Sequence, residues 1–536
     1  MSVTPKILSF AVMMALAGAA SAANTNSPAV GRALGLLQSH GSAVRASAND
    51  SFIARDVIVD ANGTEHVRFD RTYAGLPVIG GDVVVHSRSG QFKSASLTQS
   101  ASLNVNTHAN VNARDAIVSA GAEFGSDFVG TPSTSLVVYA RGNGVAKLAW
   151  QVGFAGADNA GGPVDSTYIV SAVNGKVLDR WSNIETAKPG SGGTTCSSPA
   201  GVAGTGNTLY SGAGVALNTT SCGGGTSFQM KDQSRGGGYT TNLNNGTAGT
   251  GTIFSGADNV WGNGLASNAE TAAADAHFGI AATWDYFKNV HARNGIDNAG
   301  TGALSKVHYG RNYVNAFWSD SCYCMTFGDG DGVTYGPLVN LDVAGHEMTH
   351  GVTSRTAKLV YSGESGGINE STSDIFGTMV EFAVNSPSDV PDYLIGEELY
   401  ISNPGNTKAF RYMYNPALEG AGRSVNCWSS GVGSLDVHYS SGPGNHFFYL
   451  LAEGSAAKTF SNGTITSPTC NGSSVTGIGR AAAEKIYYRA LTVYMTSSTN
   501  YAGARTATLS AAADLYGSGT ANYNAVAAAW SAVNVN

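Results

Sequence analysis

Charged side chains are scarce in this sequence. Asp, Glu, Lys and Arg make up only 12% of the 536 residues, about half the share found in typical soluble proteins. No block of Lys and Arg stands out, and the formal net charge is −7. The chain therefore lacks the basic surface that nucleic acids and anionic membranes attract, and we expect neither as a partner. Abundant Gly, Ser, Thr and Asn instead predict a polar, weakly charged surface, which suits an extracellular protein better than a cytosolic one.

Long apolar runs are also lacking, except at the N-terminus. Lys6 precedes an apolar run from Ile7 to Ala20, and Ala20-Ser21-Ala22 follows as a small-residue cleavage site. This pattern predicts a signal peptide over residues 1–22. A membrane anchor is the alternative, but about 14 apolar residues are too few to span a bilayer comfortably. We therefore expect a secreted protein without stable membrane association.

Cysteine is absent before residue 190, and all six cysteines follow it. An even number in an exported chain predicts disulfides, although six cysteines allow about 15 pairings. Proximity favours the pairs Cys196–Cys222, Cys322–Cys324 and Cys427–Cys470. The Cys-x-Cys pair is the weakest of these, because a disulfide that closes so short a loop is strained. A thiolate metal site is the alternative, which export disfavours.

The first third of the chain is predicted to form a small α+β unit. The length suggests two or three domains in all. Residues 23–50 are rich in Ala, Ser and Asn, and we expect them to be loosely ordered. Residues 51–185 contain alternating apolar runs separated by turns, with a helix over 112–124 and further strands from 136 to 181. The scattered histidines of this part, His40, His66, His86 and His108, are interpreted as ordinary surface or strand residues and not as ligands.

A boundary follows at residues 186–200, where Pro, Gly and Ser predict an exposed linker that proteases can reach. Residues 201 to about 264 predict short strands and loops. An apolar stripe then predicts a helix over 268–294, and a strand-like segment covers 313–318. The Asp/Gly alternation at 327–332 could be a calcium loop, but it lacks the downstream glutamate of an EF-hand, so a plain turn is favoured.

Helices dominate the last third of the chain. They are predicted from about residue 341, over 367–382, and at 445–453, 478–496, 502–515 and 521–533, with an irregular stretch between 385 and 435. Strands first and helices later give an α+β layout. The predicted division is a strand-rich lobe at 201–355 and a mainly helical lobe at 356–536.

The candidate site centres on His-Glu-Met-Thr-His at residues 346–350. His346 and His350 are four residues apart, so on a helix they share one face and can bind one metal ion. Glu347 stands beside them, where its carboxylate can take a proton from a metal-activated water. A catalytic zinc needs a third protein ligand and an open position, and Glu370 is the strongest candidate. Asp374, one helical turn further, can accept a hydrogen bond from the outer nitrogen of a ligand histidine.

The alternative interpretation makes Glu370 and Asp374 solvent-facing helix charges. This is hard to sustain in so charge-poor a protein, because the same helix carries the apolar face of Ile368, Ile375 and Met379. We therefore keep both carboxylates in the metal site.

Together these motifs resemble the thermolysin family of secreted zinc metalloendopeptidases, close to its elastase-type bacterial members. The segments are His-Glu-Met-Thr-His at 346–350, Gly-Gly-Ile-Asn-Glu-Ser-Thr-Ser-Asp-Ile-Phe-Gly at 366–377, Asn-Ala-Phe-Trp at 315–318, Tyr361, Gly-Arg-Ser at 422–424 and Asp-Val-His-Tyr-Ser-Ser-Gly at 436–442. In that family the glutamate ligand follows the second histidine by the spacing seen between His350 and Glu370. The resemblance covers about residues 200–536 and implies a two-lobed α+β catalytic unit with the zinc site between the lobes.

The resemblance implies roles for further residues. Glu347 is implied as the general base, which activates the water and then passes the proton to the leaving amine. Tyr361 and His438 are implied to stabilise the negative oxygen that develops on the peptide carbonyl, and Asp436 to hold His438 protonated and oriented. The implied substrate-binding groups are Arg423 for a backbone carbonyl, and Asn315 with the backbone of Ala316 for strand-like pairing with an extended peptide.

Two further expectations concern specificity and calcium. Leu338, Val343 and Ile395 match S1′ lining positions in relatives, so we expect cleavage before bulky hydrophobic residues. Elastase-type relatives have a calcium site that matches Asp342, Glu381, Asp392 and the carbonyl of Leu394, and oxygen ligands suit calcium. We expect one structural calcium ion here and not a double site; the alternative is a set of exposed acids.

The segment His66–Val78 resembles the propeptide of the same family. It implies that residues 51–185 assist folding and inhibit the enzyme until they are removed, with 23–50 as a variable start. We expect the mature enzyme to be a monomer that acts on proteins and peptides. One rival is a secreted binding protein with a structural zinc, but a closed site needs four protein ligands. Another is an exopeptidase, for which no charged groups that hold a peptide terminus are evident.

Overall fold

The structure is a computed structural model of the chain. It describes residues 27–536 except 126–127, 143, 158–162, 185–195, 404, 406, 421 and 461–462. The expected signal peptide and most of the expected linker at 186–200 lie outside these residues. Among the helices that are described, none has the length and apolar character needed to cross a membrane.

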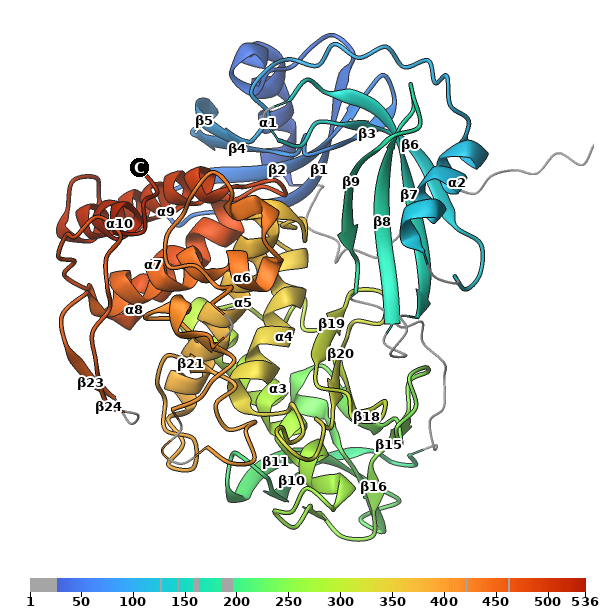
Figure 1. Ribbon diagram of the computed structural model, residues 1–536, viewed down its shortest axis with the longest axis vertical. Helices are drawn as coiled ribbons and strands as arrows, with labels where there is room; N and C mark the ends of the chain where they lie inside the picture. Colours follow the sequence, from blue (N-terminus) through green and yellow to red (C-terminus); the bar gives the residue numbers. More distant parts are fainter. Residues whose placement is uncertain are drawn as a thin grey trace, which may run out of the picture.

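The described part of residues 27–184 is built around one large sheet (Figure 1). Its strands are β1 (Asp50–Val59), β2 (Thr64–Tyr73), β3 (Leu76–Ile79), β4 (Val83–Arg88), β5 (Gln91–Leu97), β6 (Ser133–Tyr139), β7 (Lys147–Ala157), β8 (Pro163–Ser171) and β9 (Val177–Ser182). The order is β5-β4-β2-β3-β6-β7-β8-β9, with β1 paired to β2. Helix α2 (Ala113–Phe124) packs on β7 and β8 through Ala116 and Ala120. The strands and the helix predicted for 51–185 are confirmed.

The expectation of a loosely ordered start was wrong for residues 28–44. They form helix α1 (Pro28–Ser39) and a 3₁₀ turn at Gly41–Val44. Ala29, Ala33 and Leu37 recur every four residues and, with neighbours, bury one stripe against Val67 and other strand side chains. Ser27 caps the helix by accepting the N–H of Ala29 at 3.3 Å. The composition favours disorder, but the spacing of the apolar residues is helical, and their burial on the sheet stabilises the helix.

Residues 196–354 contribute two smaller sheets and two long helices. The strands are β10 (Ala200–Asn207), β11 (Ala213–Cys222), β12 (Ser227–Gln229), β13 (Lys231–Asp232), β14 (Gly238–Asn242), β15 (Thr252–Ile253), β16 (Ser255–Gly256), β17 (Val260–Trp261), β18 (Leu304–Tyr309), β19 (Ala316–Ser319) and β20 (Cys324–Gly328). Their orders are β16-β12-β11-β10-β17 and β13-β14-β18-β20-β19, with β15 on β14. Helices α3 (Ala269–His291) and α4 (Leu341–Ser354) pack against these strands. The strand expected from 313 begins only at Ala316.

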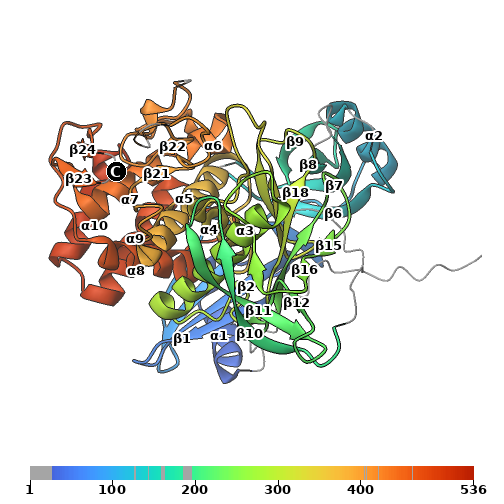
Figure 2. The same ribbon diagram turned by 90° about the horizontal axis from the view of Figure 1, so that it is seen from below.

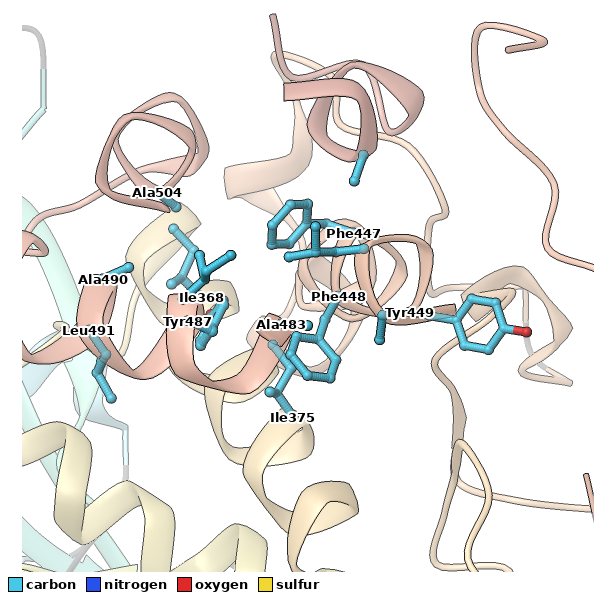
Figure 3. Close-up of a cluster of buried hydrophobic side chains, with 14 of the residues drawn as sticks. Ile368, Ile375, Phe447, Phe448, Tyr449, Ala483, Tyr487, Ala490, Leu491 and Ala504 are labelled. Carbon is cyan, nitrogen blue, oxygen red and sulfur yellow. The ribbon is translucent and has the colours of Figure 1, made fainter. Parts of the chain in front are cut away.

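The remainder is mainly helical, as predicted. Its helices are α5 (Gly363–Val384), α6 (Val437–Ser440), α7 (Gly442–Glu453), α8 (Arg480–Arg489) with a π-helical turn at Ala490–Tyr494, α9 (Tyr501–Tyr516) and α10 (Ala521–Ala532). Two short ribbons, β21 (Leu394–Ile395) with β22 (Arg411–Tyr412) and β23 (Lys458–Phe460) with β24 (Gly463–Ile465), complete it. Figure 3 shows the core of this part, in which α7, α8 and α9 surround α5. Phe447 there stacks on Trp530 at 3.7 Å between ring centroids.

The three disulfides form in the pairs that proximity favours. Cys196 joins Cys222, Cys322 joins Cys324, and Cys427 joins Cys470. The described part of the chain has no free cysteine. A thiolate metal site is therefore wrong for these residues.

The large sheet rests on the helical part through buried polar contacts. In both views β1 and β2 lie next to the C-terminal helices, and the start of β8 and the end of β9 face the lobe of β18–β20 (Figures 1 and 2). Arg68 of β2 donates to the carbonyl oxygen of Met495 at 2.8 Å, although its side chain is almost fully buried. Asp82 accepts the N–H of Ser497 at 3.0 Å.

Two of the four scattered histidines meet at this boundary. His66 of β2 and His86 of β4 are strand residues, as expected, but both are buried. Their Nδ1 atoms are 2.7 Å apart. The ring of Tyr494, from the π-helical turn, lies 4.9 Å from the ring of His86.

Candidate metal centre and active site

Helices α4 and α5 hold the candidate metal ligands, and two glycines let them approach closely. A Cβ added at Gly345 of α4 would lie 3.0 Å from the Cα of Gly377 on α5. A Cβ added at Gly377 would lie 2.5 Å from the carbonyl oxygen of Asp342. The two backbones thus touch where any other residue would separate them. This brings α5, with Glu370, under the histidines of α4.

The three predicted ligands converge. The Nε2 atoms of His346 and His350 are 3.1 Å apart, and the carboxylate oxygens of Glu370 lie 3.5 Å from His346 and 3.4 Å from His350. A tetrahedral zinc site with bonds of about 2.0–2.1 Å needs ligand atoms separated by roughly 3.3 Å. Glu370 Oε2 is buried and has no hydrogen-bond partner, as expected of an atom that binds an ion. This donor set therefore fits one zinc ion.

The outer nitrogens of both histidines are bound. His346 Nδ1 lies 2.8 Å from Asp374 Oδ1, and His350 Nδ1 lies 2.8 Å from Asn369 Oδ1. These contacts fix each ring with Nε2 directed at the metal position. Asp374 thus contacts the outer nitrogen of His346, the contact expected from the sequence. Asn369 was missed, although it is the residue immediately before Glu370 in the same motif.

Asp374 is itself held by two residues that the sequence did not indicate. Arg411 donates to Oδ2 from Nε at 2.7 Å, and Asn445 donates to the same oxygen at 2.8 Å. Burial opposes ionisation, but the charge of Arg411 and the bond to His346 hold the pKa of Asp374 well below its usual range. Asp374 is therefore an anion, and both of its carboxylate oxygens accept hydrogen bonds.

Glu347 lies on α4 next to the metal position and is only 6% exposed. Burial raises the pKa of its carboxyl to about 7. A carboxylate with a pKa near neutrality can both take up and release a proton at the operating pH. This agrees with the expected role of Glu347 as a base.

Tyr361, His438 and Asp436 lie on the open side of the site. The Tyr361 hydroxyl hydrogen-bonds to Glu370 and lies 3.3 Å from His438 Nε2. Asp436 caps the short helix α6 and binds His438 Nδ1 at 2.8 Å. Partial desolvation opposes protonation, but Glu370 and Asp436 raise the pKa of His438 to about 9. Both carboxylates therefore favour the protonated, hydrogen-bond-donating form of His438.

The structure brings Arg411, and not Arg423, to the wall of the site. Arg411 and His438 line a cavity of about 320 Å³, whose other lining residues are Tyr335, Tyr400, Ala409, Phe410, Glu419, Gly420 and Tyr439. The guanidinium of Arg423 is exposed, stacks on the ring of Tyr439 and donates to its hydroxyl at 2.8 Å. Arg411 lies in a stretch predicted to be irregular, so no periodicity could single it out.

Asn315 and Ala316 lie at the start of β19, which is the last strand in the order of its sheet. Asn315 is exposed, and its Oδ1 accepts the N–H of Ala316 at 3.0 Å. An edge strand offers backbone groups to an added extended peptide. The three expected S1′ residues, Leu338, Val343 and Ile395, are buried near α4.

An acidic cluster lies at the far end of α5. Carboxylate oxygens of Glu381, Asp389 and Glu397 all lie within 4.8 Å of one another. Four of these oxygens are buried without a hydrogen-bond partner. Burial and mutual repulsion raise the pKa of each carboxyl well above its usual range. Buried anions this close require a cation, and an all-oxygen set fits calcium.

Of the four residues expected to bind calcium, only Glu381 belongs to this cluster. Asp342 accepts the N–H of Gly396 at 2.6 Å, and Asp392 accepts the N–H of Leu394 at 2.7 Å. Sequence reasoning missed Asp389 as a candidate, because it lies in an irregular loop where an acidic residue carries no periodic signal.

Comparison with known proteins gives three family matches. Residues 203–354 match the model described as thermolysin metallopeptidase, catalytic domain, and residues 357–535 match thermolysin metallopeptidase, alpha-helical domain. Residues 50–98 match the fungalysin/thermolysin propeptide motif.

Two sequence relatives agree with these matches. A transglutaminase-activating metalloprotease of Streptomyces mobaraensis is 47% identical over 494 residues, which are 91% of this chain and 61% of that relative. A thermolysin of Alicyclobacillus acidocaldarius is 37% identical over 496 residues, 89% of this chain and 84% of the relative. Among solved structures, the precursor of protealysin, a metalloproteinase from Serratia proteamaculans, is 29% identical with a TM-score of 0.43, covering 56% of this chain and 87% of that one.

Proposed function

The chain belongs to the thermolysin family of zinc-dependent metalloendopeptidases, and from this premise we propose that His346, His350 and Glu370 bind its catalytic zinc. The observation that carries the proposal is the convergence of their ligand atoms around the buried, unpartnered oxygen of Glu370. Zinc bound there would polarise a substrate carbonyl and would lower the pKa of a water, which then loses its proton more readily as it attacks that carbonyl.

The proposed chemistry assigns the proton transfers to Glu347. It takes a proton from the attacking water and delivers it to the leaving amine, for which a pKa of about 7 is well matched. Tyr361 and His438 donate hydrogen bonds to the carbonyl oxygen as negative charge develops on it. Asp436 keeps His438 protonated and oriented through the bond at 2.8 Å.

Substrate binding is proposed along β19 and in the cavity lined by Arg411 and His438. Asn315 and the backbone of Ala316 pair with an extended peptide at the sheet edge. Arg411 replaces Arg423 as the group that binds a substrate carbonyl, because it is held rigidly by Asp374 and lines the cavity beside His438. Leu338, Val343 and Ile395 favour cleavage before bulky hydrophobic residues.

A structural calcium ion is proposed at the acidic cluster of Glu381, Asp389 and Glu397. Four unpartnered buried oxygens support it. Asp342 and Asp392, which the resemblance also implies as ligands with the carbonyl of Leu394, add negative charge near Glu381. Calcium there would tie the end of α5 to the loop that follows it.

The first part of the chain is proposed to be a propeptide at residues 51–185, with a variable start at 23–50 and a processing linker at 186–200. The catalytic lobes would then be 201–355 and 356–536, and the mature enzyme a secreted monomer after loss of residues 1–22. Arg141 supports an inhibitory role, because it donates to the carbonyl of Ser362 at 3.1 Å, next to Tyr361. Arg141 also donates to the carboxylate of Asp179, on β9 of the large sheet, at 2.7 Å. The proposed propeptide would thus contact the residue next to Tyr361.

Replacing Glu347 tests the function directly. Glu347→Gln should bind zinc as the parent does but should neither digest casein nor cleave its own linker. A blocked internal peptide, with and without a zinc chelator, separates an endopeptidase from an exopeptidase. Full casein digestion by Glu347→Gln would remove Glu347 from the base role. Zinc binding by a parent protein that digests nothing would support a structural zinc instead.

A further inference from the structure

A row of polar groups crosses the boundary between the large sheet and the helical lobe. His66 Nδ1 lies 2.7 Å from His86 Nδ1, and both residues are 3% exposed. On one side the row continues to Ser96 Oγ, 2.8 Å from His86 Nε2. On the other side it continues to Asp60, whose Oδ2 lies 3.1 Å from His66 Nε2. Arg489 of α8 then binds both oxygens of Asp60, at 3.0 and 2.7 Å.

These contacts fix the hydrogens of both rings at neutral pH. The Asp60 carboxylate can only accept, so His66 donates to it from Nε2, and a neutral His66 ring then accepts at Nδ1. His86 must therefore donate from Nδ1 and accept the hydroxyl hydrogen of Ser96 at Nε2. With both imidazoles neutral, every ring nitrogen has a complementary partner.

The row can take up one proton but not two. After one protonation, His66 donates from Nδ1, while His86 moves its hydrogen to Nε2 and donates to Ser96. A second proton makes both rings cations that each carry a hydrogen on Nδ1. Two N–H donors would then face each other across 2.7 Å, a distance that only a donor and an acceptor can occupy.

The charged groups around the pair add to this restriction. Arg489 Nη2 lies 3.4 Å from His66 Nε2, and Arg68 on β2 adds positive charge near His86. The carboxylates of Asp60 and of Asp514 on α9 offset part of it; Asp514 binds Arg489 at 2.8 Å. Burial lowers the pKa of His66, and burial with the surrounding cations lowers the pKa of His86 further. Tyr494 packs on His86 as a neutral ring.

We propose that His66 and His86 form a pH-sensitive latch between the propeptide and the catalytic unit, which protonation of both rings opens. The partner is the chain's own helical lobe, held through Asp60, Arg489 and the ring of Tyr494. The inference rests on the proposed function in one respect, that this sheet is a removable, inhibitory propeptide. Acidification would thus loosen the inhibitor from the enzyme that carries it.

The direction and steepness of the pH dependence of docking follow from the number of protons taken up on opening. The docked sheet disfavours protonated rings, so docking is strongest above the ordinary histidine pKa of about 6.5 and weakens as the pH falls below it. Uptake of two protons on opening lowers the docking equilibrium by up to about 100-fold per pH unit, whereas one proton gives about tenfold. The slope therefore distinguishes a pair from a single titrating group.

The test uses the full chain with Glu347→Gln, which keeps the linker uncut. Hydrogen exchange read by mass spectrometry, with labelling times scaled for the intrinsic effect of pH, follows β2, β4 and residues 489–497 from about pH 8 to about pH 4.5. We expect these segments to lose protection together below about pH 6.5, with a slope above one proton, while α4 and α5 stay protected. Protection unchanged across this range, or lost from the whole chain at once, would overturn the latch.

Three variants sharpen the result. His86→Asn keeps an N–H for His66 but cannot be protonated, so opening should move to lower pH with a one-proton slope. Asp514→Asn removes an offsetting carboxylate, so opening should move to higher pH. His108→Asn, at an exposed histidine in the connection between β5 and α2, should change nothing.

The variant outcomes decide the proposal even if one variant fails to fold. A parent-like pH profile in His86→Asn overturns it, and so does a loss of protection in Asp514→Asn that is equal at every pH. Exchange is read without any peptide cleavage, so a failed latch is distinct from a failed peptidase. The casein assay on the parent protein tests the latter separately.

Discussion

Replacing Asp374 by asparagine should weaken zinc binding although Asp374 never touches the metal. Its two oxygens accept from His346, from Arg411 and from Asn445. An amide of the same shape offers one acceptor oxygen and one NH₂ group. The amide is neutral, so His346 and Arg411 both lose their anionic partner. Whichever way the new side chain turns, its NH₂ group also faces at least one donor.

The expected magnitude follows from these contacts. Loss of an outer-shell carboxylate costs about 10- to 100-fold in metal affinity, which is about 1.4–2.7 kcal/mol. Arg411 is only 16% exposed, and breaking a largely buried ion pair destabilises folding by about 3 kcal/mol or more. The variant should therefore fold less stably and also release zinc more readily.

Zinc affinity is measured by competition with a chelator of known affinity, and stability by thermal unfolding, both in the Glu347→Gln background to prevent self-digestion. Asp275→Asn is the matched control, because Asp275 is a buried carboxylate that accepts backbone N–H groups of residues 209–211 away from the metal. It should lower stability but leave zinc affinity unchanged. A zinc affinity in Asp374→Asn within about threefold of the parent would refute the reasoning.

Three further predictions concern stability and docking. Phe447→Ala removes a ring that is fully buried and stacked on Trp530, so chemical unfolding should show a loss of about 3–5 kcal/mol; a loss under about 1 kcal/mol would contradict the packing described. Calcium removal with zinc retained should lower the unfolding temperature, and more so as the pH rises, because the folded chain holds protons on Glu381 and its neighbours whose pKa is raised; an unfolding temperature indifferent to calcium would contradict the site. Arg68→Ala should expose β2 to hydrogen exchange without changing kcat/KM of the processed enzyme; unchanged protection of β2 would show that the bond to Met495 does not hold the sheet.

The fold was predictable where periodicity is strong and local. The strands of residues 51–185 and helix α3 follow directly from alternation and from an apolar stripe. Helix α1 was not predicted, because its segment is rich in alanine and serine, a composition typical of disordered chain. The helix is stable only because its apolar stripe is buried on the sheet. The short helix α6 also escaped prediction, since a cap by Asp436 and one turn of chain leave no periodic signal.

The sequence predicted those residues of the candidate site that lie on one helix or within one sequence motif. The positions of His346 and His350 on one face follow from helical geometry, and the approach of Glu370 follows from the family spacing. Arg411 and Asn445 reach Asp374 from segments far along the chain, so only tertiary packing reveals them. Asp389 likewise joins Glu381 through a loop whose path the sequence does not specify.

The contact between Gly345 and Gly377 means that the geometry of the metal centre depends partly on two positions that lack a Cβ atom. A designer who copied the three ligands onto another pair of helices would inherit their spacing along each helix but not the distance between the axes. Even alanine at Gly377 would collide with the carbonyl oxygen of Asp342 and would tilt the glutamate away from the histidines. Libraries that vary only metal-contacting residues would therefore overlook the positions that hold this centre together.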